Sequence, residues 1–234
     1  MKTRLSIIIP VWNNYNLTMK CLEDLSELPD DHEIIVVDNG STDSTRNLES
    51  TSKIKVLRNK TNLGFSKSVN IGYSMSSGSC VMFLNNDIRV RSDKQTWTLP
   101  IIEAAESDKC LIGPTVGVLD SGFNFITEAS KMPTKGYIYM SGWNITASID
   151  TWKDLVLDEY SGPFTEEFGQ AYFEDTDLGL RAHEKEIQLK IVPCPVHHFG
   201  KMTSKKLGTL TLYQPAKEKF INKWDERAKP LLRK

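Results

Sequence analysis

The sequence lacks the features that would place the chain in a membrane or in an oxidising compartment. No apolar run approaches the ~20 residues that cross a bilayer, and the first residues lead straight into a short apolar segment with no signal-peptide cleavage region. The four cysteines share no C-x-x-C spacing and lie far apart, at Cys21, Cys80, Cys110 and Cys194. We therefore expect a cytoplasmic protein with free thiols, and neither a disulfide framework nor a structural zinc site.

The usual signatures of dinucleotide, P-loop and nucleic-acid binding are also missing. After the first predicted strand, residues 10–14 read PVWNN, which contains neither a G-x-G-x-x-G fingerprint nor a P-loop lysine. The net charge is −1, and without broad basicity we expect no nucleic-acid partner. The 234 residues include 25% charged and 39% hydrophobic residues, which is typical of a soluble globular protein.

What the sequence has is a regular alternation of strands and helices. Strands are predicted at 5–9, 33–38, 54–57 and 80–84, and helices at 17–25 and 64–75. Pro10, which cannot donate a backbone hydrogen bond, is expected to end the first strand, and Asn16 is available to cap the first helix. This alternation predicts an α/β fold with a mainly parallel central sheet flanked by helices.

Polar side chains follow two of these strands. Asp38 ends the second strand, and Asn85-Asn86-Asp87 follow the fourth. Open α/β sheets bind ligands just past the carboxyl ends of their strands, so Asp38 could read a ribose or a base edge and Asp87 could hold a divalent cation. The alternatives are a turn or cap role for Asp38 and a polar turn at 85–87.

The second half is less regular, with further strands predicted at 109–113, 136–140 and 189–192. Glu174, Asp175 and Asp177 form an acidic cluster at the start of a helix predicted from Asp177 onward, where the helix dipole favours negative charge. The cluster could aim one carboxylate into a cleft, or be only an acidic first turn. His197 and His198 follow two prolines, a rigid approach that suits metal ligands or a structural role.

The C-terminal segment is basic. From 201 to 234 there are ten Lys or Arg residues and three acids, a net +7, which leaves −8 for the rest of the chain. Such a segment can be a solvated face, a phosphate contact or a contact with an anionic membrane. Apolar residues at 213, 216, 220, 221 and 224 favour a last helix that packs on the domain, although closure over a ligand or membrane contact would use the same pattern.

Seven motifs, in order, resemble the family-2 inverting glycosyltransferases with the GT-A fold. They are SIIIPVWN (6–13), IVVDNGSTD (35–43), NLGF (62–65) with Asn70 and Gly72, LNND (84–87), GPF (162–164), FEDTDL (173–178) with Arg181, and HFG (198–200). Within that family the sequence is most similar to the rhamnosyltransferase-like branch of polysaccharide biosynthesis. The resemblance implies a single domain over 1–234, with a nucleotide-sugar-binding half (about 1–90), an acceptor-binding half (about 91–204) and a basic helical tail (205–234).

The resemblance also implies how the donor and a metal are held. The residues implied to contact the nucleotide sugar are Pro10, Val11, Trp12, Asp38, Gly64, Asn86 and Asp87. The first three would line the nucleotide pocket, Asp38 would accept from the base or ribose, and Gly64 would let the chain approach the nucleotide. Asn85 replaces the first acid of the family's Asp-x-Asp motif, so Mn²⁺ or Mg²⁺ would be held by Asp87, His198 and the diphosphate. His197 is the second choice, because the family's His-x-Gly spacing fits His198.

On the acceptor side, the resemblance implies that Asp175 is the general base. Glu174 would contact the acceptor, while Asp177 would cap the helix and pair with Arg181 at i+4. The expected reaction moves one sugar from a UDP- or dTDP-linked donor to a hydroxyl of a glycan or lipid-linked acceptor, with a possible peripheral contact at the inner membrane face. A nucleotidyltransferase and an inactive sugar-binding domain remain as alternatives, the second because Asn85 replaces an acid.

Overall fold

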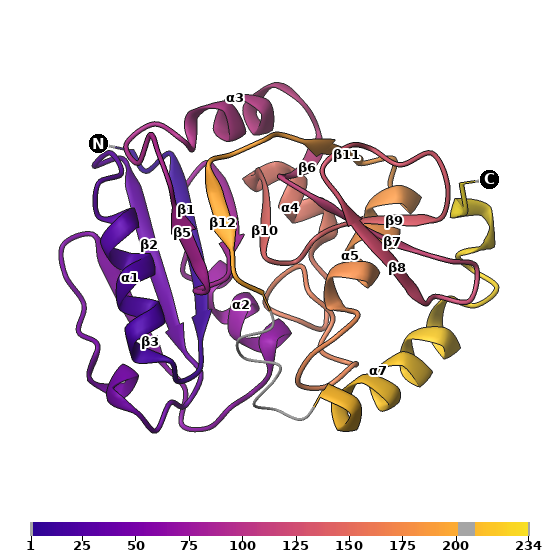
Figure 1. Ribbon diagram of the computed structural model, residues 1–234, viewed down its shortest axis with the longest axis horizontal. Coiled ribbons are helices and arrows are strands. Elements are labelled where there is room, and N and C mark those ends of the chain that lie inside the picture. The colour runs from indigo at the N-terminus through magenta and orange to yellow at the C-terminus, as the bar shows by residue number, and fades with distance from the viewer. Residues whose placement is uncertain (1, 201–208, 234) are drawn as a thin grey trace.

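The computed structural model describes residues 2–200 and 209–233, and its centre is a seven-stranded sheet in the order β11-β6-β10-β4-β1-β2-β3 (Figure 1). Its strands are β1 (Leu5–Val11), β2 (His32–Asp38), β3 (Ile54–Arg58), β4 (Cys80–Leu84), β6 (Cys110–Gly113), β10 (Asn144–Ser148) and β11 (Gln188–Ile191). Every neighbouring pair is parallel except the two pairs that β10 makes with β4 and β6. The predicted α/β fold with a mainly parallel sheet is confirmed.

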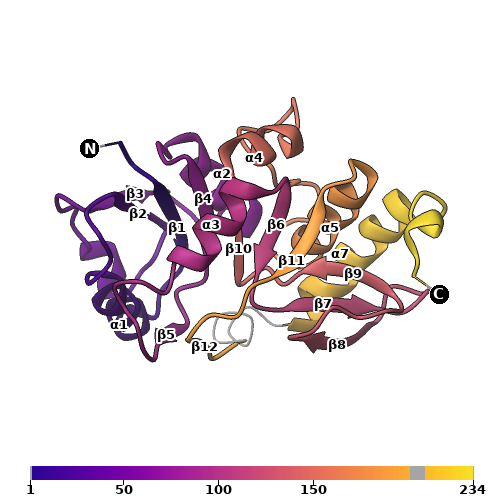
Figure 2. The same ribbon diagram turned by 90° about the horizontal axis from the view of Figure 1, so that it is seen from above.

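Two smaller sheets complete the strands of the described chain. β12 (Val196–His198) pairs antiparallel with β5 (Ile88–Val90), which directly follows the 85–87 segment. A three-stranded sheet contains β7 (Val116–Leu119) between β8 (Phe125–Ala129) and β9 (Tyr137–Met140). Figure 2 shows this second sheet at the far end of the molecule from β1–β3.

Helices cover both faces of the central sheet (Figure 2). α1 (Tyr15–Leu25) and α3 (Leu99–Ser107) pack on one face, while α2 (Phe65–Ser74), α4 (Ile149–Leu155) and α5 (Glu174–Glu184) pack on the other. Alternate residues of β4 enter the two cores, so Met82 faces α1 and α3 whereas Phe83 faces α2, α4 and α5. Burial on both faces explains why these strands are continuous apolar runs.

α7 (Thr209–Trp224) is the last long helix, and it lies beside α5 (Figure 1). Ala216, Phe220 and Trp224 are fully buried in a third core with Leu180 of α5. The apolar residues of the basic segment therefore pack on the domain as part of a last helix, as predicted. The lysines at 201, 205 and 206 lie outside the described residues. Two short 3-10 helices, η1 (Ser44–Asn47) and η2 (Lys229–Leu231), complete the elements of residues 2–200 and 209–233. None of the helices in the described ranges is long and apolar enough to span a bilayer.

The first strand does not end at Pro10, as predicted, but continues to Val11. Pro10 lies opposite Val37 of β2, whereas the pairing of β1 with β4 stops at Ile8. Backbone groups of successive residues point to opposite neighbours, and Val11 points to β2, where its carbonyl accepts from Asn39 N at 2.8 Å. The missing N–H of Pro10 therefore faces the side on which β1 is unpaired.

Two predicted helix starts are also wrong. α1 begins at Tyr15, so Asn16 lies inside the helix, and the cap comes from another loop, where Asp43 Oδ2 accepts from Tyr15 N at 3.1 Å. α5 begins at Glu174 with Phe173 at its N-cap. Asp177 is therefore within the helix and does not cap it.

Candidate active site

The carboxyl ends of the parallel strands bring the polar segments together at one edge of the sheet. In the strand register, Val11 lies opposite Asp38, and Asp38 lies opposite Arg58. On the other side of β1, β4 ends at Leu84, which lies opposite Asn144 at the start of the antiparallel strand β10. The loops after β1, β2, β3 and β4 and the segment before β10 thus share this edge.

Side-chain hydrogen bonds join the loops that follow β1, β2 and β3. Asn13 Oδ1 accepts from Thr42 N at 2.8 Å, which ties the first loop to the second. Asn39 Nδ2 donates to Asn62 Oδ1 at 2.7 Å, and Asn39 Oδ1 accepts from Leu63 N at 2.9 Å, which ties the second loop to the third. The asparagines of these motifs therefore shape the rim rather than point freely into solvent.

Asp38 is fully buried at the end of β2. Its Oδ1 accepts from Ser41 N at 2.9 Å, and its Oδ2 accepts from Arg58 Nε at 2.9 Å. The Arg58 side chain is 42% exposed, so this buried carboxylate is connected to a cation at the surface. Each carboxylate oxygen has two acceptor sites, so both oxygens keep capacity for a further donor.

The other predicted donor contacts lie around this rim. Val11 is buried, while Pro10 and Trp12 are partly exposed. Gly64 has a φ of +87°, and a Cβ there would lie 2.9 Å from Gln170 Cα, so only glycine fits where this loop meets the loop before α5. Asn86 is buried and donates through Nδ2 to Thr18 Oγ1 of α1 at 2.8 Å.

Asp87 and His198, which were predicted as metal ligands, lie close together. His198 Nε2 lies 3.0 Å from Asp87 Oδ1 and 3.5 Å from Asn85 Nδ2. The pairing of β12 with β5 brings them together, since Ile88 lies opposite His198 and Phe199 N donates to Asp87 O at 2.9 Å. The His197 ring instead packs edge-on against Phe199, at 4.9 Å between centroids.

The donor atoms of this pair fit a divalent cation. A separation of about 3 Å is that of adjacent ligands of an octahedral ion with bonds of about 2.1 Å, and a carboxylate oxygen with an imidazole nitrogen suits manganese. Within the described ranges, no group of three or more His, Cys, Asp or Glu side chains could hold a metal. The pair alone would give an ion two ligands, so the remaining ligands of an ion held there would have to come from elsewhere.

Glu174 and Asp175 lie in the first turn of α5, both partly buried. Asp175 Oδ2 accepts from Gly142 N at 3.0 Å, and its Oδ1 accepts from Thr176 N at 2.8 Å. Burial raises the pKa of Asp175 above the ordinary carboxyl range, although these hydrogen bonds oppose the rise. Burial and the neighbouring Asp175 charge raise the pKa of Glu174 as well. Two adjacent carboxyl groups with raised pKa values suit proton transfer near neutral pH.

The turn before these acids is strained and is held by α7. Tyr172 and Phe173 have φ values of +79° and +68°, a left-handed conformation that non-glycine residues seldom adopt. The Phe173 ring stacks on Phe220 at 4.8 Å between centroids, and it packs against Tyr213 at 5.3 Å. The C-terminal helix therefore supports the segment that presents Glu174 and Asp175.

We expect Glu174→Gln to make stability less sensitive to alkaline pH. A raised pKa means that the folded state holds the proton more tightly, so stability falls as pH rises from the ordinary value of about 4.3 toward the raised pKa. Urea unfolding at pH 5, 7 and 9 should show a smaller loss for Glu174→Gln than for the wild type. The exposed residue Glu103 of α3 provides the control, Glu103→Gln, which should follow the wild type. Equal losses in all three proteins would contradict the raised pKa.

Gly142 and Trp143, which precede β10, contact one residue of each predicted pair: Asp175 of the acidic pair Glu174–Asp175, and His198 of the predicted metal pair Asp87–His198. Gly142 N donates to Asp175, as described above, and the Trp143 ring stacks on His198 at 4.8 Å with 11° between the planes. No role was predicted for this Gly-Trp pair from the sequence. The available signal was its position after a predicted strand.

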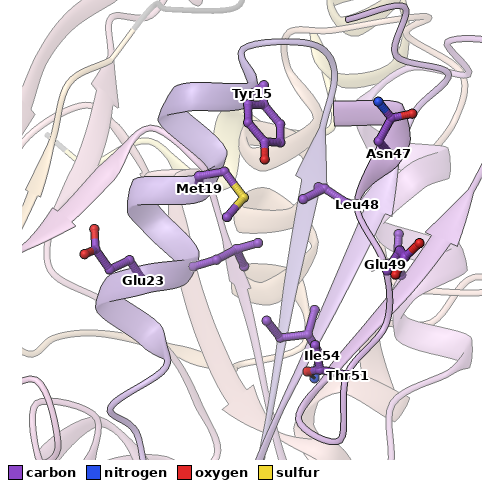
Figure 3. A pocket seen from close by; sticks show the side chains of 10 residues that line it. Tyr15, Met19, Glu23, Asn47, Leu48, Glu49, Thr51 and Ile54 are labelled. Atoms are coloured by element: carbon purple, nitrogen blue, oxygen red, sulfur yellow. Dashed lines mark hydrogen bonds between the residues drawn. The ribbon is translucent and has the colours of Figure 1, made fainter. Parts of the chain in front are cut away.

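A groove elsewhere on the molecule contains none of the predicted site residues (Figure 3). It has a volume of about 440 Å³ and lies between α1 and the edge strand β3, with Tyr15, Met19 and Glu23 on one side and Leu48 and Ile54 on the other. It is mainly apolar. It lies under α1, on the face of the sheet, rather than at the carboxyl ends of the strands.

Comparison with known proteins gives a family for most of the chain. The family model described as Glycosyl transferase family 2 matches residues 6–157. This span includes Asp38 and Asp87 but ends before Asp175 and His198. An uncharacterized glycosyltransferase of Haemophilus influenzae is 30% identical over 127 residues, which are 53% of this chain and 43% of that protein. The glycosyltransferase GlyG of Streptococcus pneumoniae is 24% identical over 131 residues, with the same two shares. The chain spans less than half the length of these curated relatives.

Solved structures similar to this chain include a mannosyltransferase and the S. aureus protein TarS. The mannosyltransferase PcManGT from Pyrobaculum calidifontis, in complex with GDP-Man and Mn²⁺, has a TM-score of 0.60 at 14% identity, over 82% of this chain and 55% of that chain. S. aureus TarS in complex with UDP-GlcNAc has a TM-score of 0.58 at 18% identity, over 82% of this chain and 57% of that chain. These likenesses confirm the predicted GT-A fold.

Proposed function

This chain belongs to glycosyl transferase family 2, and on that basis we propose that it moves one sugar, with inversion, from a nucleotide-diphosphate sugar to a hydroxyl group of a glycan or lipid-linked acceptor. One observation carries the proposal. The segment Gly142-Trp143 contacts Asp175 on one side and His198 on the other, so a carboxylate that can act as base lies beside a pair that can hold a cation. Inverting transfer needs these two groups near one another.

In the proposed reaction, Asp175 acts as the general base. The acceptor oxygen forms a bond to the anomeric carbon while the bond from that carbon to the diphosphate oxygen breaks, and the hydroxyl proton passes to the Asp175 carboxylate. A single displacement of this kind inverts the anomeric centre. Glu174, whose raised pKa keeps it protonated to a higher pH, is proposed to hydrogen-bond the acceptor.

On the donor side, the proposed contacts are those at the rim of the sheet. Pro10, Val11 and Trp12 would line the nucleotide pocket beside the nucleobase. Asp38 would accept a hydrogen bond from the nucleobase or its ribose through the acceptor sites that Ser41 and Arg58 leave open. Gly64 and Asn86 would shape the same pocket. Asp87 and His198 would hold Mn²⁺ or Mg²⁺ together with the diphosphate, and a cation bound there would neutralise the charge that develops on the leaving group.

The finer assignments are also proposals. The donor is proposed to be UDP- or dTDP-linked, as in the rhamnosyltransferase-like branch of polysaccharide biosynthesis. Residues up to about 90 would bind the donor and residues from about 91 to 204 the acceptor. The solved neighbours carry GDP-Man with Mn²⁺ and UDP-GlcNAc, which supports a nucleotide-sugar donor of some kind.

A donor screen tests the function. The protein is incubated with UDP-, dTDP- and GDP-sugars, Mn²⁺ and candidate acceptors, and released nucleotides are identified by mass spectrometry. Release of a nucleoside diphosphate supports sugar transfer. In a parallel incubation with a nucleoside triphosphate and a sugar phosphate, release of pyrophosphate would identify a nucleotidyltransferase instead. Binding of a sugar nucleotide without turnover in either incubation would indicate an inactive binding domain.

We expect Mn²⁺ to bind at least tenfold more tightly with a nucleoside diphosphate than without one. Asn85 replaces an acid, so the protein contributes one carboxylate and one imidazole, and the phosphate oxygens must supply further ligands. Calorimetric titration of Mn²⁺, with and without saturating UDP, dTDP or GDP, measures this difference. His198→Gln should weaken binding in the presence of nucleotide, whereas His197→Gln should not. Equal Mn²⁺ affinity with and without nucleotide would contradict the proposed ligand set.

A further inference from the structure

The Trp143 side chain contacts the predicted metal ligand His198 and also two anchoring residues, Thr115 just before β7 and Glu128 in β8. One face of its ring stacks on the His198 imidazole, nearly parallel to it. Its Nε1 donates to Thr115 Oγ1 and to Glu128 Oε1, both at 3.0 Å, and Thr115 Oγ1 donates to the same Glu128 oxygen at 2.5 Å. The indole N–H is thus held by two acceptors other than His198, and this fixes the plane of the ring on which the imidazole stacks.

The Trp143 backbone contacts the segment that carries Asp87, the other predicted metal ligand. Its carbonyl accepts from Asn85 N at 2.9 Å, which holds the segment that ends in Asp87. Trp143 therefore contacts both the segment that leads to Asp87 and the strand β12 that carries His198. A tryptophan that served only to fill the core would not need a fixed N–H, a parallel imidazole and this backbone contact at once.

Gly142 makes the corresponding contact with the acidic pair. Its N–H donates to Asp175 Oδ2, and a Cβ at this position would lie 2.9 Å from the same oxygen and 3.1 Å from Asp175 Cβ. Glycine is the one residue that allows the backbone to approach Asp175 this closely. The hydrogen bond also favours the ionised carboxylate, because it lowers the pKa of Asp175 against the effect of burial.

We propose that Gly142 and Trp143 are positioning residues that set the base and the metal ligand relative to each other, with Thr115 and Glu128 anchoring the Trp143 ring. This inference rests on the proposed function. Residues around a metal ligand orient it, and their loss commonly lowers metal affinity or activity by about 10–100-fold. Because Gly142 and Trp143 are adjacent in the chain, a displacement of His198 would be transmitted directly to Asp175, and the reverse.

The Trp143 half is tested by Mn²⁺ titration in the presence of whichever of UDP, dTDP and GDP the wild type binds best. Trp143→Leu removes the stacking and should lower Mn²⁺ affinity by about 10–100-fold. Trp143→Phe keeps an aromatic ring but removes the N–H, so its loss of Mn²⁺ affinity should be smaller than that of Trp143→Leu. Glu128→Ala, an exposed position where folding is not at risk, should shift the affinity in the same direction. The control is Trp152→Phe, which removes a different buried indole, one that donates to Val81 O at 2.9 Å.

The Gly142 half is tested by the pH dependence of kcat. The titratable groups that interact with Asp175 in the described chain are Glu174 on the same helix and Tyr139 of β9. Gly142→Ala leaves these groups in place but displaces Asp175 from its donor. We expect kcat to fall at least tenfold, the acidic limb of its pH profile to move to higher pH, and the KM for the donor to change little. Gly122→Ala, in the exposed turn before β8, should leave the profile unchanged.

The outcomes separate the two proposals. If the wild type consumes no sugar nucleotide, the proposed function is wrong. If the wild type transfers sugar but Trp143→Leu and Glu128→Ala bind Mn²⁺ like Trp152→Phe, or Gly142→Ala keeps the wild-type kcat and pH profile, the positioning role is overturned while the function stands.

Discussion

Asp175→Asn should lower sugar transfer by about 10²–10⁴-fold, which is the range that general-base assistance contributes. The asparagine side chain has nearly the same size and can still accept from Gly142 N, but it cannot take the proton of the acceptor hydroxyl. Donor affinity should change little, because the proposed donor contacts come from the segments that follow β1, β2, β3 and β4 rather than from α5. Transfer is measured by nucleotide release, and donor binding by calorimetry.

A matched control separates this chemical effect from a loss of structure. Asp154 is an exposed carboxylate that pairs with Lys109 at the other side of the fold, and Asp154→Asn should transfer sugar like the wild type. Thermal unfolding should show that Asp175→Asn remains folded, with a cost of about 1 kcal/mol for one lost hydrogen bond. A variant that loses nucleotide affinity but retains its turnover would contradict the assignment of Asp175 as base.

Asp177→Ala should lower the free energy of unfolding by about 3–5 kcal/mol, a large part of the 5–15 kcal/mol typical of a domain. Asp177 is fully buried, and its Oδ2 accepts from Arg181 Nε at 2.7 Å. Its Oδ1 accepts from Trp224 Nε1 at 2.9 Å and lies 3.0 Å from Lys223 Nζ, so the carboxylate also joins α5 to α7. Removing it leaves the buried Arg181 guanidinium without its carboxylate partner.

The consequence extends to the site, because α7 packs against Phe173 just before Glu174 and Asp175. Urea unfolding followed by tryptophan fluorescence measures the loss of stability. Asp150→Ala is the matched control. It removes a carboxylate from an exposed i,i+3 pair with Lys153, a contact expected to contribute less than about 1 kcal/mol. If Asp177→Ala were no more destabilising than Asp150→Ala, the buried network would not support α7.

The predicted pairing of Asp177 with Arg181 is confirmed, but the larger role of Asp177 was not predictable. An i,i+4 pair is visible in the sequence because helix geometry fixes the separation of the two side chains. The contacts with Trp224 and Lys223 join residues more than forty positions apart, and no periodicity records them. The same holds for the cap of α1, which Asp43 supplies from a different loop.

The second half shows why the prediction was weakest there. The stretch from Val116 to Asp158 contains three strands of a separate sheet and the antiparallel strand β10, each only four or five residues long. Short strands carry little alternation, so their order and direction depend on contacts with distant segments. The insertion of β10 between β4 and β6 is what brings Gly142 and Trp143 to the edge of the sheet that carries Asp87.

By itself, the sequence determined the class of fold and the edge at which polar groups gather. Long apolar runs must be buried on both faces, and parallel strands place all their carboxyl ends on one side. Only the tertiary structure decided which of those groups touch. Asp87 meets His198 because β12 returns to pair with β5, and Asp175 meets Gly142 because α5 packs beside the segment before β10. Such contacts depend on how distant segments pack, which local sequence patterns do not specify.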